Sequence, residues 1–64
     1  MTLEKWRIRM GWSQTHLANT LTKKLGRSIS QQNIYSWETG TTPSADAATA
    51  IKKLTKGAVA WAEN

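Results

Sequence analysis

The residues of this chain that could do chemistry are amides rather than catalytic groups. Its 64 residues include no Cys, one His and four Asp or Glu. There is no thiol nucleophile, no pair of carboxylates and no phosphate-cradling Gly loop, so we expect no enzymatic activity. His16 alone is too few ligands for a metal, and we expect neither metal nor cofactor. Residues 28–40, SISQQNIYSWETG, instead gather amides, hydroxyls and two aromatics around one charge, Glu38.

The positive charge of the chain lies outside this stretch. Nine Lys and Arg against four Asp and Glu give a formal net charge of +5, which indicates a polyanionic partner such as nucleic acid. The length suits one small domain over 1–64. No apolar run approaches a membrane span, and the N-terminus lacks the apolar region of a signal peptide, so we expect a cytoplasmic protein.

Helical apolar spacing recurs in four segments, each followed by a glycine. We predict an all-α fold with helices at 2–10, 14–25, 31–39 and 45–56. Glycine adopts the left-handed conformation that ends many helices, and the four glycines are Gly11, Gly26, Gly40 and Gly57. We expect residues 58–64 to form either a short fifth helix or an irregular tail that packs Trp61 on the core. A strand that pairs with a second copy is the alternative.

The starts of the helices are marked by serines. Ser13, Ser30 and Ser44 each precede a predicted helix, where a hydroxyl can accept from free helix-terminal amides. Apolar residues expected on inward faces include Leu3, Trp6, Met10, Leu17, Leu21, Ile34 and Ile51, with Trp12 and Trp37 also in the core.

Two consecutive segments then resemble a known family. WSQTHLANTL followed by SISQQNIYSWETG is similar to the helix-turn-helix of the phage repressor and Cro family, also called XRE-type. The matching residues are Ser13, Gln14, Leu17, Ala18 and Leu21, then Ser30, Gln31, Gln32, Ile34, Trp37, Glu38 and Gly40. Between them TKKLGRS replaces the early glycine of the family pattern, which predicts an extra helical turn that ends at Gly26.

The resemblance implies which residues contact DNA bases. In such motifs the second helix enters the major groove with its N-terminal residues at base edges. The family's base-reading positions are Gln31 and Gln32, and the further candidates are Asn33, Tyr35 and Ser36. An amide places a donor beside an acceptor, which matches N6 and N7 of adenine.

The resemblance also implies phosphate contacts and an ion pair. The expected phosphate contacts are Gln14, Ser30, Thr39, Thr41 and Thr42, together with Lys23, Lys24 and Arg27. The three basic residues could equally form a solubilising face. Arg7 is expected to pair with Glu38, and Glu38→Gln to lower stability with base preference unchanged.

The function implied is a double-stranded DNA-binding transcriptional regulator, a Cro-like phage or prophage repressor. It would bind a palindromic operator as a homodimer, at least on DNA, without a membrane or small-molecule ligand. Two alternatives stay open. One is the antitoxin of a toxin–antitoxin pair, and the other is a protein-interaction module that does not bind DNA.

Overall fold

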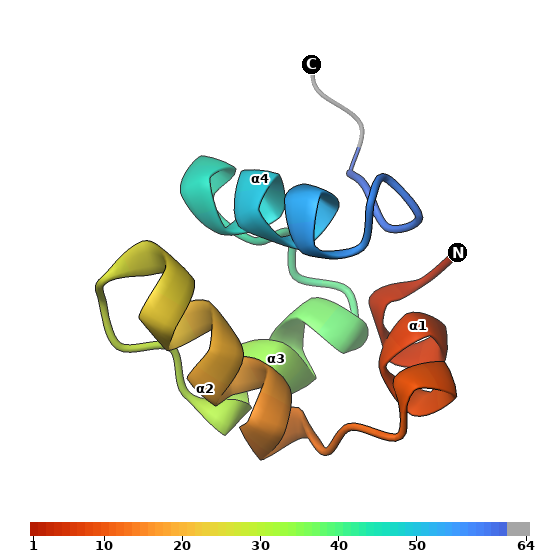
Figure 1. The fold of residues 1–64 in the computed structure, drawn as a ribbon, viewed down its shortest axis with the longest axis horizontal. Coiled ribbons are helices and arrows are strands. Elements are labelled where there is room, and N and C mark those ends of the chain that lie inside the picture. Colours follow the sequence, from red (N-terminus) through yellow and green to blue (C-terminus); the bar gives the residue numbers. More distant parts are fainter. Residues whose placement is uncertain (62–64) are drawn as a thin grey trace.

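The computed structural model describes residues 1–61, which form four helices and no strand (Figure 1). The helices are α1 (Leu3–Met10), α2 (Gln14–Leu25), α3 (Gln31–Glu38) and α4 (Ala45–Leu54). α2 packs against both α3 and α4, whereas α1 packs against α3. The predicted all-α class is confirmed. Within this part of the chain, no helix has the length and apolar character needed to span a bilayer.

The predicted C-terminal ends of α1 and α2 are confirmed, because Gly11 and Gly26 follow these helices with φ of 75° and 69°. The prediction for α4 is wrong at its C-terminal end, since α4 stops two residues early at Leu54. The Thr55 hydroxyl donates to the Ile51 carbonyl at 2.8 Å and accepts from the Val59 N–H at 3.1 Å. The chain leaves the helix just after Thr55, where Lys56 and Gly57 have φ of 55° and 84°, and the bond to Val59 holds this turn.

Two smaller differences concern the other ends. Thr2 is the N-cap of α1 rather than its first residue, and its hydroxyl accepts from the Lys5 N–H at 3.2 Å. α3 ends at Glu38, and Thr39 follows it as the C-cap.

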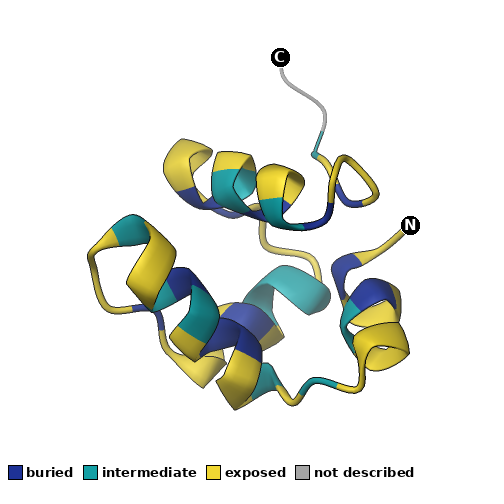
Figure 2. Cartoon of the chain, viewed as in Figure 1, coloured by how far each residue is buried: buried dark blue, intermediate teal, exposed yellow. Residues whose placement is uncertain are grey.

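The core lies where α2, α3 and α4 meet, and their dark blue faces in Figure 2 point toward one another. Leu17, Leu21, Ile34 and Ile51 are fully buried there. Burial of such side chains is the main stabilising term for a domain of this size. Partly buried residues packed against this cluster are Trp12, Leu25, Trp37, Ala50, Leu54 and Trp61.

Met10 was expected in the core and is instead 49% exposed. Leu3 and Trp6 supply the buried face of α1. Trp12 packs edge-to-face on Trp6, with ring centroids 5.3 Å apart. The aromatic residue after the turn therefore covers Trp6, while Met10 stays in solvent.

Residues 58–61 form neither helix nor strand. Val59 is buried at 2% exposure, and Trp61 packs partly buried on the core. The Met1 amino group donates to the Ala58 carbonyl at 3.0 Å, which ties the N-terminus of the chain to this segment. The irregular tail is thus confirmed over 58–61, and the remainder of the predicted segment, 62–64, lies outside the described residues.

Candidate functional site

α3 presents an uncharged polar face to solvent. Gln31, Gln32 and Tyr35 are exposed, and Tyr35 retains 50% of its accessible surface. Ile34 is fully buried, about 160° around the helix from Gln32. Because successive helical residues are about 100° apart, Gln31 and Tyr35 fall on one face and Gln32 on its flank. Of the two other predicted base contacts, Asn33 is exposed and Ser36 is half-buried.

A capping box fixes the first turn of α3. The Ser30 hydroxyl accepts from the Asn33 N–H at 3.2 Å, and the Asn33 Oδ1 accepts from the Ser30 N–H at 2.9 Å. Two free helix-terminal donors are thereby satisfied. The Ser30 hydroxyl lies 3.0 Å from the same Asn33 oxygen as a second donor, so a two-bond contact of Asn33 with adenine would compete with the box. Sequence reasoning missed this capping role.

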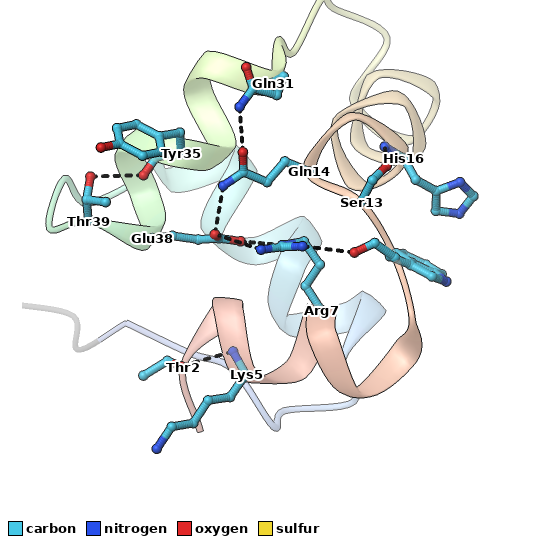
Figure 3. A network of polar contacts seen from close by, with 11 residues as sticks. Thr2, Lys5, Arg7, Ser13, Gln14, His16, Gln31, Tyr35, Glu38 and Thr39 are labelled. Atoms are coloured by element: carbon cyan, nitrogen blue, oxygen red, sulfur yellow. Dashed lines mark hydrogen bonds and ion pairs between the residues drawn. The ribbon is translucent and has the colours of Figure 1, made fainter.

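Gln14 connects the two ends of α3 (Figure 3). It is the first residue of α2, where the Ser13 hydroxyl caps the helix by accepting from the His16 N–H at 3.0 Å. The Gln14 Nε2 donates to Glu38 Oε1 at 2.9 Å, and its Oε1 accepts from the Gln31 Nε2. Gln31 and Glu38 are two helical turns apart, about 10 Å along the axis. One side chain from α2 therefore links the first and last residues of α3.

Glu38 also forms the ion pair with Arg7 that the resemblance implies. Arg7 Nε donates to Glu38 Oε2 at 2.6 Å, and Nη2 donates to Oε1 at 3.2 Å. The Arg7 Nη1 donates to the Trp12 carbonyl at 2.9 Å. The hydrogen bond to Glu38 raises the pKa of Arg7. The Glu38 side chain is 1% exposed and that of Arg7 13%, so the pair is nearly closed to water.

We call Gln31, Gln14, Glu38 and Arg7 the polar chain. It runs from the exposed start of α3 to the guanidinium on α1 through contacts between three helices. Sequence reasoning placed each of these four residues at the site but did not predict that Gln14 joins Gln31 to Glu38. The only signal for the connection is the seven-residue spacing of Gln31 and Glu38 on one helical face.

The basic residues expected at phosphates lie elsewhere. Lys23 and Lys24 are exposed in the last turn of α2, about 14 Å along the helix from Gln14. Arg27 binds Asp46 of α4 through Nε–Oδ2 and Nη2–Oδ1 contacts of 3.0 Å each. Among residues 1–61, no side-chain hydrogen bond or ion pair joins any of these three residues to Gln31.

Ser44 makes no side-chain cap on α4, although it stands at the N-cap position. Its hydroxyl donates to Asp46 Oδ1 at 2.7 Å and accepts from Arg27 Nη2 at 2.9 Å. Asp46 Oδ1 takes over part of the capping by accepting from the Ala47 N–H at 2.8 Å. The nearby carboxylate and guanidinium thus draw the Ser44 hydroxyl away from the helix terminus.

The threonines follow the other end of α3. The Thr39 hydroxyl donates to the Tyr35 carbonyl at 2.9 Å, and the Thr41 N–H donates to the Ser36 carbonyl at 2.9 Å. Thr39, Thr41 and Thr42 are all exposed. They and the glutamines therefore lie at opposite ends of α3.

Comparison of the chain with protein-family models, with curated proteins and with solved structures finds no match. The chemistry of the site must therefore carry the functional argument.

Proposed function

We propose that the chain is a sequence-specific, double-stranded DNA-binding transcriptional regulator, a Cro-like phage or prophage repressor. α2 and α3 would form its helix-turn-helix, and α3 would lie in the major groove with Gln31 and Gln32 at base edges. Tyr35 and Ser36 follow one turn later. Asn33 is left out of this proposed set because its oxygen serves the capping box.

One observation carries the proposal. The first side chain of α3, Gln31, is exposed yet held by a bond from its Nε2 to Gln14, which is itself anchored on the enclosed Glu38. Exposed glutamines ordinarily sample many rotamers, and ordering one costs free energy. A side chain ordered before it meets its ligand loses less entropy on binding, as recognition of a base edge requires.

The charge of the molecule fits the same function. The net charge of +5 attracts DNA without regard to sequence. Free amide N–H groups at the starts of α2 and α3 favour nearby phosphate, and Gln14 stands at one of these starts. Uncharged amides on α3 leave discrimination to hydrogen-bond patterns.

A binding titration tests this function. We expect the chain to bind duplex DNA tightly at low salt, with log affinity falling linearly against log salt concentration at a slope of about −0.9 per phosphate contacted. A selected duplex should bind at least about a thousandfold more tightly than a scrambled one. The absence of binding to any duplex at low salt would reject the function in favour of a protein-interaction module.

A further inference from the structure

We propose that a groove over α4 docks an acidic peptide segment of a protein partner, with an apolar side chain of that segment seated between lysines. We call this surface the lysine groove. It shares no residue with the exposed face of α3, so the inference goes beyond the proposed function and does not depend on DNA binding. The lysines that line it are Lys24, Lys52, Lys53 and Lys56.

Two hollows on the exposed side of α4 form the lysine groove. The first lies between the end of α2 and α4 and has a volume of about 500 Å³, within the range of about 300–1,000 Å³ for ligand pockets. The second, of about 530 Å³, follows the last turn of α4. Thr49 and Lys53 line both hollows, so the groove is continuous. The exposed side of α4 points away from the core in Figure 2, which leaves the groove open to a partner.

The first hollow combines apolar surface with two cations. Leu25 and Ala50 are partly buried against the core, and Ala45 lines the hollow with them. Lys24 and Lys53 are exposed and line the same hollow. A phosphate gains nothing from apolar surface, whereas an apolar side chain is stabilised when it leaves water. A peptide that carries carboxylates beside an apolar residue therefore fits this hollow better than nucleic acid does.

The lysines of the groove have no acidic partner among residues 1–61. The ion pairs in this part of the chain join Arg7 to Glu38 and Arg27 to Asp46. Asp46 is the only carboxylate of these residues that lines the groove, and Arg27 already binds both of its oxygens. Like charges gathered on one surface repel one another, and an acidic segment relieves that repulsion.

Lys56 occupies a position that favours glycine. The Lys56 N–H donates to the Lys53 carbonyl at 3.2 Å. The Gly57 N–H donates to the Lys52 carbonyl at 2.8 Å, which completes a Schellman motif. Glycine usually fills the left-handed position of this motif, but here Lys56 does, with φ of 55°. A residue with a side chain is strained in that conformation, and Lys56 is exposed and lines the groove.

The dipole of α4 does not account for this arrangement. Cations are favoured in the last turn of a helix, which explains Lys52 and Lys53. The dipole gives no reason for a strained lysine after the helix, or for Lys24 of α2 in the same groove. An anionic ligand shared by these lysines explains both.

The experiment selects ligands from phage-displayed random peptides on the immobilised wild-type chain. We expect the enriched sequences to contain several Asp or Glu around an apolar residue such as Leu, Ile or Phe. The most enriched peptide is then labelled with fluorescein, and its affinity is measured by anisotropy. Because salt screens exposed charges, the affinity should fall as the salt concentration rises.

Four variants assign the binding to the groove. Lys53→Ala removes the cation that both hollows share, and Lys56→Gly removes a cation while it relieves the strain. Lys56→Arg keeps the charge at the strained position. Lys5→Ala makes the same charge change as Lys53→Ala at an exposed residue of α1, outside the groove.

We expect Lys53→Ala and Lys56→Gly each to weaken the peptide about two- to fivefold, the effect of losing one exposed ion pair. Lys56→Arg and Lys5→Ala should bind as the wild type does. Lys56→Gly should also unfold at a higher urea concentration than the wild type, since glycine adopts the left-handed conformation without strain. Its weaker binding then cannot come from a loss of folded protein.

Three affinity results would overturn the inference: a selection that enriches no acidic sequences, unchanged binding in both Lys53→Ala and Lys56→Gly, or an equal loss in Lys5→Ala. Unfolding of Lys56→Gly at a lower urea concentration than the wild type would also overturn it, because Lys56 would then serve the fold. If no acidic peptide is selected and the two lysine variants instead weaken duplex DNA by these factors, the groove binds nucleic acid and the inference is wrong.

Discussion

At the scale of single residues, Arg7 and Glu38 form the more enclosed of the two ion pairs among residues 1–61. Arg7→Met would leave the Glu38 carboxylate buried without its cation. We expect a loss of about 3 kcal/mol in the free energy of unfolding, measured by urea denaturation. Such a loss is a large share of the stability of a domain this small. Arg9→Met, on the exposed side of the same helix, is the control, and an equal effect of both changes would contradict the role of the pair.

Glu38 has a second consequence at this scale. From sequence we expected Glu38→Gln to lower stability with base preference unchanged. The contact between Gln14 and Glu38 ties the carboxylate to Gln31 through one intervening side chain. Loss of stability stays the prediction, because either orientation of the new amide sets its NH₂ group against a donor of Arg7 or Gln14. A change in base preference in the same variant would show that the contact with Gln14 reaches Gln31.

At the scale of elements, Thr22 fastens the connection between α2 and α3. Its Oγ1 accepts from the Ile29 N–H at 2.9 Å, and its one proton can go to the Ala18 carbonyl at 2.9 Å or to the Ile29 carbonyl at 3.1 Å. Ile29 is 4% exposed, so Thr22→Val would leave its backbone N–H without the Thr22 acceptor. We expect about 1–3 kcal/mol of destabilisation in urea.

Thr20→Val is the matched control for Thr22. Its hydroxyl bonds only the His16 carbonyl within α2, at 3.0 Å, so its loss should cost little. If the two valine variants unfold at the same urea concentration, Thr22 does not hold the connection.

The pair of Arg27 with Asp46 links the same connection to α4 and should depend on pH. Hydrogen bonds from Arg27, from Ser44 and from the Ala47 N–H hold the pKa of Asp46 well below its usual range. Such a pair stabilises the fold above the ordinary Asp pKa of about 3.9 and is lost as pH falls through the lower folded-state pKa. Wild type should therefore exceed Asp46→Asn in urea stability near neutral pH, and the two should converge in strong acid. A constant difference across that range would rule out this linkage.

The elements were largely predictable because their signals are local. Gly11 and Gly26 end α1 and α2 as expected, and Ser13 and Ser30 cap the helices that follow. The early end of α4 was not, because it depends on a bond between Thr55 and Val59. The link from Gln14 to Gln31 likewise requires α2 and α3 to be packed first, and no periodicity encodes that packing.

At the scale of the whole molecule, positive charge and base contacts are separated. Lys23 and Lys24 lie in the last turn of α2, Arg27 follows that helix, and Lys52 and Lys53 lie in the last turn of α4. The exposed face of α3 carries no charge between Gln31 and Ser36. We therefore expect the whole surface to attract DNA and one face of α3 to select its sequence.

A single α3 covers a short half-site, so we expect two copies on a palindromic duplex. Selected sequences should contain two inverted half-sites with centres about 10 base pairs apart, or a multiple of that spacing. Sedimentation of the complex should give two chains for each duplex. One chain on an asymmetric site would contradict the dimeric arrangement.

The most direct test of the central claim is the selection of bound duplexes by the wild type, by Gln31→Ala and by Gln32→Ala, with Lys52→Ala on α4 as control. The account predicts a defined symmetric sequence for the wild type and for Lys52→Ala. Each glutamine variant should lose preference at its own base pair in every half-site. Recovery of the same sequence from all four proteins would contradict the claim that the first turn of α3 recognises DNA bases.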